Sequence, residues 1–170
     1  MRISALEEYG IRCLVNVAFH HEEGEPVSAN AVAEAEGMSV PYAQKILRLL
    51  SQAGFVDSRR GVNGGYVLAR DPADISVGEV LRALDVGFDV SDICERHTGE
   101  LEVCTHSGSC TIKPMWTFIS EFVARTLDGL SLAVLLRGSD AVATHLSRVE
   151  APRKPEMRCP VADLAPVSAE

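Results

Sequence analysis

The stretch Ser58-Arg59-Arg60-Gly61-Val62-Asn63-Gly64-Gly65-Tyr66 decides the fold of this chain. Its glycine-rich centre can supply the positive φ angles of a tight turn. Phe55-Val56 before it and Tyr66-Val67-Leu68 after it are short apolar runs of the kind found in strands. The sequence therefore predicts a β-hairpin with two arginines at the entrance to its turn.

Two short helices joined by a tight turn are predicted directly before this hairpin. Ser28 is a suitable N-cap for the first helix, which Gly37 ends. The second helix begins after Ser39, has Pro41 in its first turn and continues to about Ala53. Two helices in this arrangement are typical of a helix-turn-helix, and the hairpin that follows corresponds to a wing.

Further helices are predicted on both sides of this unit. An apolar stripe at helical spacing runs through residues 3–20, and Ser76 can cap a helix over residues 77–84. A longer helix follows from about residue 112 to 127, and a shorter apolar segment covers 130–136. One face of the longer helix has apolar groups and a threonine at alternating steps of three and four, which indicates a coiled-coil-like seam. The seam consists of Ile112, Met115, Ile119, Phe122 and Thr126.

The chain is therefore predicted to be mostly α-helical and divided into four parts. Residues 1–85 form a winged helix-turn-helix domain, and residues 86–111 form a cysteine-bearing loop without helical periodicity. Residues 112–137 hold the long helix and the short segment after it. Residues 138–170 contain four prolines and few large apolar groups, and are expected to be a largely disordered tail.

The 170 residues have a net charge of −8, which alone argues against nucleic acid. The charge is unevenly distributed, however. Residues 39–70 carry five basic side chains and one acidic one, whereas residues 1–38 and 71–110 are both strongly acidic. Phosphate attraction is local because salt screens charges beyond roughly 10 Å. The second helix and the hairpin thus form a candidate DNA surface, although an ordinary solvated face accounts for the charge pattern equally well.

Other function classes find little support in the sequence. It has no run of eighteen apolar residues, and its N-terminus lacks the apolar core of a signal peptide, so we expect a cytoplasmic protein that does not span a membrane. It has no phosphate-binding loop, no serine–histidine pairing and no evident acidic pair. We therefore do not expect an enzyme.

Three of the five cysteines lie in the polar, glycine-dotted stretch before the long helix. Cys94, Cys104 and Cys110 are separated by nine and five residues. Iron–sulfur clusters need soft thiolate ligands at spacings that let a loop wrap the cluster, which this pattern allows. Zinc sites usually have closer Cys-x-x-Cys pairs, so zinc is the weaker metal hypothesis. Three unligated, redox-active thiols remain the alternative. Cys13 lies in the apolar stripe of the first helix and Cys159 in the tail, so neither is a candidate ligand.

Four stretches of this sequence resemble the IscR/NsrR family of bacterial winged-helix regulators, many of which carry an iron–sulfur cluster. They are Met1-Arg2-Ile3-Ser4 with Tyr9, Tyr42-Ala43-Gln44-Lys45-Ile46-Leu47, the wing Arg60-Gly61-Val62-Asn63-Gly64-Gly65-Tyr66, and Ser76-Val77-Gly78-Glu79-Val80. The resemblance spans about residues 1–137. It implies a transcription regulator that binds palindromic double-stranded promoter DNA as a homodimer, with the long helix from Ile112 as the dimerisation helix. We expect a repressor.

The candidate DNA contacts lie on the second helix of the helix-turn-helix and at the entrance to the wing. They are Tyr42, Gln44, Lys45, Arg48, Arg59 and Arg60. A glutamine can read adenine bidentately in the major groove, and lysine or arginine can bind guanine or phosphate. An arginine can also enter a narrow minor groove. The resemblance implies this minor-groove role most clearly for Arg60.

The resemblance also implies a ligand set for the cluster. Family members with sensor clusters place three cysteines in this loop, which assigns Cys94, Cys104 and Cys110 as ligands. The second interval matches theirs, whereas the first is nine residues rather than five, which leaves the cluster type open: 4Fe–4S is favoured and 2Fe–2S is the alternative. The NsrR branch uses an aspartate from the partner subunit at the position of Glu8, which makes Glu8 the candidate fourth ligand. Its alternative is a surface ion pair with Arg12.

Two histidines of the loop, His97 and His106, are reserve ligands, and Lys113 occupies the position where some family members have a histidine. The cluster would sense nitric oxide, redox state or cluster supply and so control binding to the promoter. The alternatives are a winged-helix regulator without a cluster, controlled by a protein partner or by thiol oxidation, and an electron carrier that no longer uses its DNA-like surface.

Overall fold

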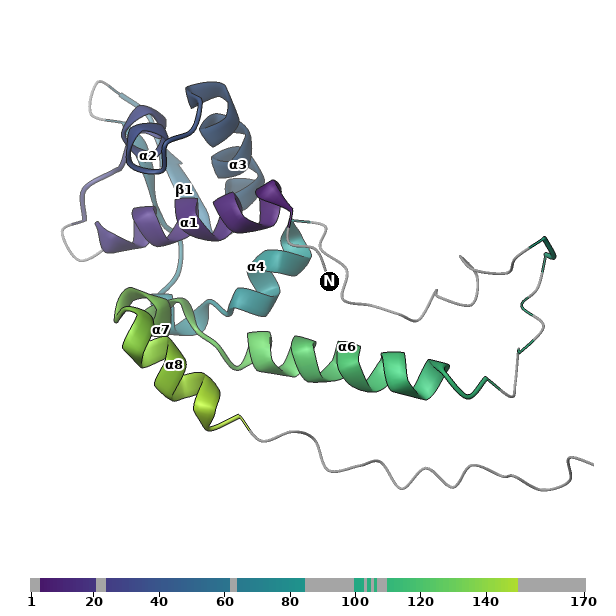
Figure 1. Cartoon of the computed structure of the whole chain (residues 1–170). Helices are drawn as coiled ribbons and strands as arrows, with labels where there is room; N and C mark the ends of the chain where they lie inside the picture. The colour runs from purple at the N-terminus through teal and green to yellow at the C-terminus, as the bar shows by residue number, and fades with distance from the viewer. Residues whose placement is uncertain are drawn as a thin grey trace, which may run out of the picture.

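The computed structural model of the chain describes residues 4–20, 24–61, 64–84, 100–102, 104, 106 and 110–149. Helices α1, α2 and α3 pack with a two-stranded hairpin into one unit, and a long helix, α6, projects away from it (Figure 1). Two short helices follow α6: α7 packs against α1, and α8 packs against α7 (Figure 1). The mostly helical fold with a small hairpin is as the sequence predicts.

Hydrogen bonds that serine side chains accept define where the first two helices begin. α1 (Ala5–Phe19) opens with a capping box, in which Ser4 accepts from the backbone N–H of Glu7 and the Glu7 carboxylate accepts from that of Ser4. α2 (Ala29–Ala35) begins at Ser28, whose hydroxyl accepts from a backbone N–H in the first turn. Both starts lie within one or two residues of the predicted ones.

The helix-turn-helix is completed by α3 (Val40–Gln52). Gly37, at a φ of 64°, makes the turn after α2, and Pro41 lies in the first turn of α3, where its missing N–H leaves no hydrogen bond broken. Ser39 is the N-cap residue of α3 but its side chain makes no capping hydrogen bond. The predicted helix-turn-helix is thus confirmed, with proline and glycine rather than a serine hydroxyl defining its turn.

The wing consists of β1 (Val56–Arg59) and β2 (Gly65–Leu68), paired antiparallel. Gly61 has a φ of 124°, as the predicted turn allows, whereas Gly65 has no positive φ. A Cβ at Gly65 would lie 2.4 Å from the carbonyl oxygen of Val27, which forms an isolated antiparallel bridge with Tyr66 of β2. This glycine is therefore required by close approach of two backbones rather than by a turn.

The second half of the fold begins with a 3-10 turn, η1 (Pro72–Asp74), and α4 (Val77–Ala83). Ser76 and Glu79 form a second capping box at the start of α4, where hydrogen bonds from Ser76 and the nearby Arg70 lower the pKa of the Glu79 carboxyl. The remaining helices are α6 (Lys113–Asp128), α7 (Leu132–Leu136) and α8 (Ser139–Ser147).

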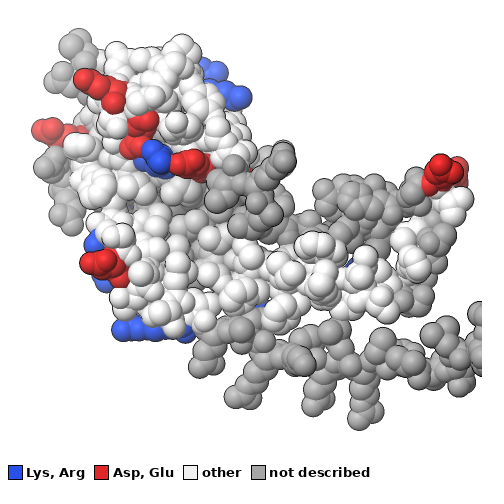
Figure 2. Space-filling view, in the orientation of Figure 1, with Lys and Arg blue, Asp and Glu red and all other residues white. Residues whose placement is uncertain are grey.

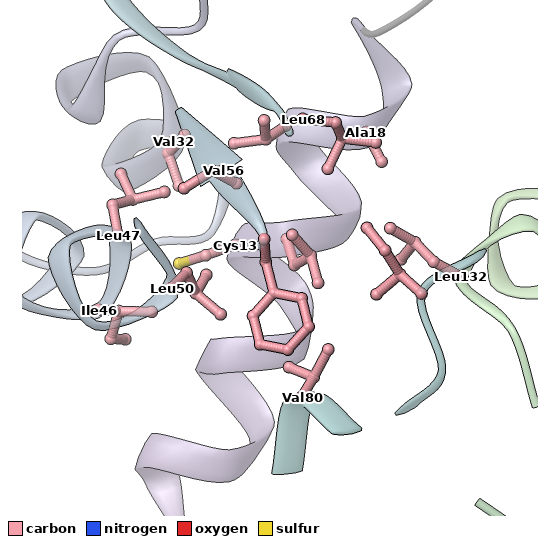
Figure 3. Close-up of a cluster of buried hydrophobic side chains, with 14 of the residues drawn as sticks. Cys13, Ala18, Val32, Ile46, Leu47, Leu50, Val56, Leu68, Val80 and Leu132 are labelled. Atoms are coloured by element: carbon pink, nitrogen blue, oxygen red, sulfur yellow. The ribbon is translucent and has the colours of Figure 1, made fainter. Parts of the chain in front are cut away.

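The larger of two apolar clusters among the described residues lies within the winged-helix unit and extends to α7 (Figure 3). Leu14 of α1, Leu50 of α3 and Leu132 of α7 are fully or almost fully buried in it. Cys13 lies in the same core beside α3, and burial raises the pKa of its thiol to about 12, with the Glu36 carboxylate contributing. Cys13 is therefore a structural apolar residue, as the sequence predicts.

The predicted C-terminal tail begins later than residue 138. Residues 139–147 form α8, which packs against α7. Gly138, at a φ of 91°, makes the turn between the two helices. The prediction missed this helix because its contact face uses small side chains, Ala141 and Val142, instead of leucines. The prolines of the predicted tail, and the tail's remaining course, lie outside the described residues. Among the helices that are described, none is both long and apolar enough to span a bilayer.

Candidate DNA-binding surface and cysteine segment

Helix α3 presents its polar face to solvent because its apolar face is fixed in the core. Ala43, Ile46, Leu47 and Leu50 are buried, and this stripe leaves Gln44, Lys45 and Arg48 exposed on the other side. Basic side chains are visible over α3, whereas acidic ones lie over α1 and α2 (Figure 2). The structure thus places these three predicted DNA contacts on one accessible face of the second helix of the helix-turn-helix.

Tyr42, the fourth predicted contact on α3, is not simply exposed. Its ring is half-buried and packs edge-to-face against Tyr9 of α1, with 6.0 Å between the ring centroids. Tyr9 in turn lies beneath the guanidinium of Arg12, 5.7 Å from its ring centroid. Tyr42 therefore connects the N-terminal half of α3 to α1, a contact that helical periodicity does not reveal because it joins two separate elements.

The two wing arginines have different surroundings. Arg59, the last residue of β1, donates from Nη1 to the carbonyl oxygen of Gly24 at 3.4 Å, so it anchors the wing to the loop before α2. Arg60 follows it at the entrance to the turn and is exposed. Of the two, Arg60 is therefore better placed to reach a DNA groove.

The cysteine segment is described only in part. Cys104 and Cys110 are half-buried and have free thiols, and His106 is exposed. The Sγ of Cys110 accepts a hydrogen bond from the backbone N–H of Lys113, the first residue of α6, at 3.3 Å. Cys94, His97 and Cys159 lie outside the described residues, and the residues that are described contain no cluster of three metal-ligating side chains.

Glu8 lies on the exposed side of α1. Its carboxylate is 2.6 Å from the guanidinium of Arg12, and Arg12 also reaches Glu36, at the end of α2, at 4.0 Å. An exposed pair four residues apart on a helix contributes only about 0.3–0.5 kcal/mol. Within one chain the structure thus contains the surface pair that was the alternative to metal ligation, and leaves the Glu8 carboxylate accessible from outside.

The long helix α6 exposes an apolar patch near its N-terminus. Ile112 is 60% exposed, and Met115, Trp116 and Ile119 are between 41% and 48% exposed. Ile112, Met115 and Ile119 belong to the predicted seam, and Trp116 lies beside it. Four neighbouring large apolar groups on one helix face are more than a monomer usually exposes, and indicate a surface that another protein covers.

Comparison with known proteins agrees with this combination of features. The Rrf2 family, described as iron-dependent transcriptional regulators, matches residues 3–138. Protein rrf2 of Nitratidesulfovibrio vulgaris is 34% identical over 137 residues, which cover 81% of this chain and 88% of the relative. The HTH-type transcriptional regulator IscR of Serratia proteamaculans is 31% identical over 142 residues, covering 84% and 83%.

Solved structures give the same result. The structure of T. potens IscR superposes with a TM-score of 0.61 at 32% identity, covering 81% of this chain and 87% of that one. CymR of B. subtilis, a global cysteine regulator, gives a TM-score of 0.67 at 28% identity, covering 82% and 99%. These likenesses confirm the winged-helix fold and a regulator rather than an enzyme. The chain belongs to the Rrf2 family of DNA-binding transcriptional regulators.

Proposed function

We propose that this protein is a homodimeric repressor that binds palindromic promoter DNA in the cytoplasm and is controlled by an iron–sulfur cluster on Cys94, Cys104 and Cys110. The observation that carries the cluster proposal is the position of Cys110. Its sulfur caps the first free N–H of α6, where the partial positive charge of a helix N-terminus favours an anionic ligand. A change in the ligation of this sulfur would therefore alter the hydrogen bond at the first turn of α6.

The donor atoms present fit such a cluster. Cys104 and Cys110 are free thiols and only half-buried, so they are available as soft ligands, unlike the buried Cys13. When bound, the cluster supplies reactivity toward nitric oxide or oxidants. The protein's own contribution would be to hold the Cys110 thiolate at the start of α6 and to keep Cys104 and Cys110 half-buried. A 4Fe–4S cluster is favoured and a 2Fe–2S cluster is the alternative.

The DNA-binding proposal assigns different tasks to α3 and the wing. Gln44, Lys45 and Arg48 project from the exposed face of α3 and would lie in the major groove, with Tyr42 fixing the orientation of α3 against α1. Arg60 would enter the adjacent minor groove. A homodimer, paired through the apolar patch of α6, would present two such surfaces to the two halves of a palindrome.

A DNA-binding assay on a selected operator tests these roles. Gln44→Ala should relax specificity at one base pair per half-site by about 1–3 kcal/mol, because a bidentate base contact is lost. Arg60→Ala should weaken binding and reduce the preference for an A/T-rich minor groove. Arg59→Ala is the matched control, since its guanidinium already bonds to Gly24. Equal weakening of Gln44→Ala on all sequences would make that residue a phosphate contact, and equal effects of the two arginine variants would contradict the assignment of Arg60.

A second candidate function is control by thiol oxidation without a cluster. Its support is the likeness to CymR, of which an oxidised form from Staphylococcus aureus superposes with a TM-score of 0.63 at 26% identity. The free thiols of Cys104 and Cys110 are compatible with this alternative as well. Anaerobically purified protein separates the two functions. A brown protein with bound iron and sulfide, whose Mössbauer spectrum gives the cluster type, supports the proposal, and a colourless protein without iron contradicts it.

The fourth ligand of the cluster is proposed to be Glu8 of the partner subunit. Carboxylate is a hard ligand for a site that prefers sulfur, so this bond should be labile, as a sensor requires. It would also connect α1 of one subunit to the cysteine segment of the other. The Glu8 carboxylate would then exchange its pairing with Arg12 for the cluster.

Stopped-flow absorbance against nitric oxide tests Glu8. Glu8→Ala should shift the cluster spectrum and speed its reaction, because a ligand is removed. Arg12→Ala is the matched control, since it breaks the same ion pair but keeps the carboxylate, and it should leave the spectrum unchanged. Superimposable traces for wild type and Glu8→Ala would rule out the ligand, and an identical spectral shift in both variants would assign the effect to the ion pair.

A further inference from the structure

The winged-helix unit and α6 are fixed to each other at a joint for which the proposed function has no role. Two backbone hydrogen bonds form it: Val77 N–H donates to the carbonyl of Leu130, and Leu132 N–H donates to the carbonyl of Ile75, both at 2.8 Å. They connect the N-terminal end of α4 to residues 130–132, which follow the C-terminal end of α6. We refer to residues 75–82 and 128–132 together as the α4–α6 joint.

Side-chain contacts between α4 and the end of α6 add to these two backbone hydrogen bonds. Arg82 Nη1 lies 2.7 Å from Asp128 Oδ1, at the last residue of α6. Gly78 lies directly beneath, because a Cβ there would be 2.0 Å from Asp128 Oδ1 and 3.0 Å from its backbone nitrogen. Only a residue without a side chain lets the end of α6 rest on α4 at this distance. Beneath it, Val77, Leu81 and Leu130 are buried together.

The joint lies at one end of α6 and the apolar patch begins at the other (Figure 1). The 16 residues of α6 correspond to a length of about 24 Å at 1.5 Å per residue. A rotation of about 10° at the joint therefore displaces the far end of α6 by about 4 Å. Lengthening the gap between two half-sites by one base pair moves one of them by about 3.4 Å along the duplex and turns it by about 35° around the duplex axis. The two displacements are of similar size.

The cysteine-bearing stretch connects the same two helices. It begins where α4 ends at Leu84 and finishes at Cys110, whose sulfur is bonded to the first turn of α6. The stretch of sequence that carries the three cysteines therefore joins the two helices whose relative direction the joint fixes.

We propose that the α4–α6 joint sets the half-site spacing that the dimer accepts, with Gly78, Arg82 and Asp128 as its positioning residues. This inference rests on the proposed dimer and its palindromic operator. The Arg82–Asp128 pair is about half exposed, so it adds little to the free energy of folding, and its role is to fix the direction of α6. Gly78 has the larger effect, because a Cβ there displaces the Asp128 carboxylate, breaks its pairing with Arg82 and crowds the Asp128 backbone nitrogen, so the end of α6 must shift.

Binding to duplexes of varied spacing tests the proposal on the full-length protein. The operator is first selected from a random duplex library with wild type, and its two half-sites are then separated by one base pair more or less. Wild type should bind either altered duplex about 10-fold more weakly or worse, because one half-site then loses specific base contacts. Gly78→Ala should shift the preferred spacing or reduce the preference to about 3-fold or less, while its affinity for a single half-site stays that of wild type.

A matched glycine provides the control. Gly129→Ala, at the next position of the joint, places its Cβ 3.4 Å from the carbonyl of Arg125, an ordinary contact, and should keep the wild-type spacing profile. If Gly78→Ala proves unfolded by circular dichroism, the neutral variants Arg82→Gln and Asp128→Asn carry the test and should broaden the spacing profile.

Folded, dimeric variants of Gly78, or of both Arg82 and Asp128, with the wild-type profile would overturn the proposal. A wild-type protein that selects only isolated half-sites would instead overturn the proposed dimer on a palindrome, and this inference with it.

Discussion

Replacing Cys110 with alanine abolishes the bound iron and sulfide that we expect in the anaerobically purified protein. Cys110 is both a proposed ligand and the hydrogen-bond acceptor at the start of α6, so its loss removes one thiolate and frees the N–H of Lys113. A cluster with one protein thiolate fewer is not retained, because soft sulfur ligands supply most of its binding free energy. Iron and acid-labile sulfide are measured per chain, together with the visible absorbance. Cys104→Ala and Cys94→Ala should behave in the same way.

Two variants separate the loss of a ligand from the loss of structure. Cys110→Ser keeps an oxygen that can accept the Lys113 N–H, so α6 should begin normally while the cluster is still lost. Cys13→Ala removes a thiol that is fully buried in the core, and should keep wild-type iron content at some loss of stability, as a small buried truncation does. Full iron content in the three loop variants would refute the ligand assignment.

Introducing a charge at Ile119 separates the proposed dimer into monomers and abolishes operator binding. Ile119 is the last residue of the exposed apolar patch of α6 and is 44% exposed in one chain. In a dimer paired through this patch, Ile119→Glu would bury a carboxylate without a partner, which costs several kcal/mol. One helix-turn-helix alone makes too few contacts to hold an operator tightly, so DNA affinity should fall together with the dimer. Sedimentation velocity gives the oligomeric state and fluorescence anisotropy the affinity.

The control for this variant lies on the opposite face of the same helix. Glu121 is two positions from Ile119, about 200° around the helix, and is exposed beside Arg125. Glu121→Lys changes the charge of α6 more than Ile119→Glu does, yet it should remain dimeric and bind DNA. An intact Ile119→Glu dimer would place the subunit interface elsewhere on the molecule.

Local sequence signals account for most of the winged-helix unit. Ser28, Gly37 and Pro41 act on their own neighbours, so the boundaries of α2 and α3 follow from capping and turn chemistry alone. The wing could be predicted for the same reason. Its close backbone approach at Gly65 could not, because this depends on Val27, which is distant in sequence.

Contacts between elements are what the sequence did not reveal. The Tyr9–Tyr42 ring contact and the Arg82–Asp128 pair each join residues from two separately predicted helices, and no periodicity relates them. Gly78 lies in a stretch quoted for its resemblance to the family, but its packing against the end of α6 became apparent only in three dimensions. The short helix α8 was missed because small side chains form its packed face.

The candidate site divides in the same way. Periodicity places Gln44, Lys45 and Arg48 on the free face of α3, since the buried stripe of one helix defines its exposed face. The cysteine ligands rest on residue type and spacing, and only Cys104 and Cys110 belong to the described residues. Whether Glu8 reaches the partner's cysteines is decided by the geometry of two chains, which the sequence of one chain does not contain.

The central claim is that a cluster on these cysteines controls binding to the promoter. Its most direct test is the dissociation constant for one selected operator, measured by anaerobic fluorescence anisotropy before and after the cluster is removed from the same wild-type sample. We predict a change of about 10-fold or more, which corresponds to a coupling free energy within the usual allosteric range. Cys110→Ser should show the cluster-free affinity under both conditions. An unchanged dissociation constant for wild type, with iron loss verified, would contradict cluster control.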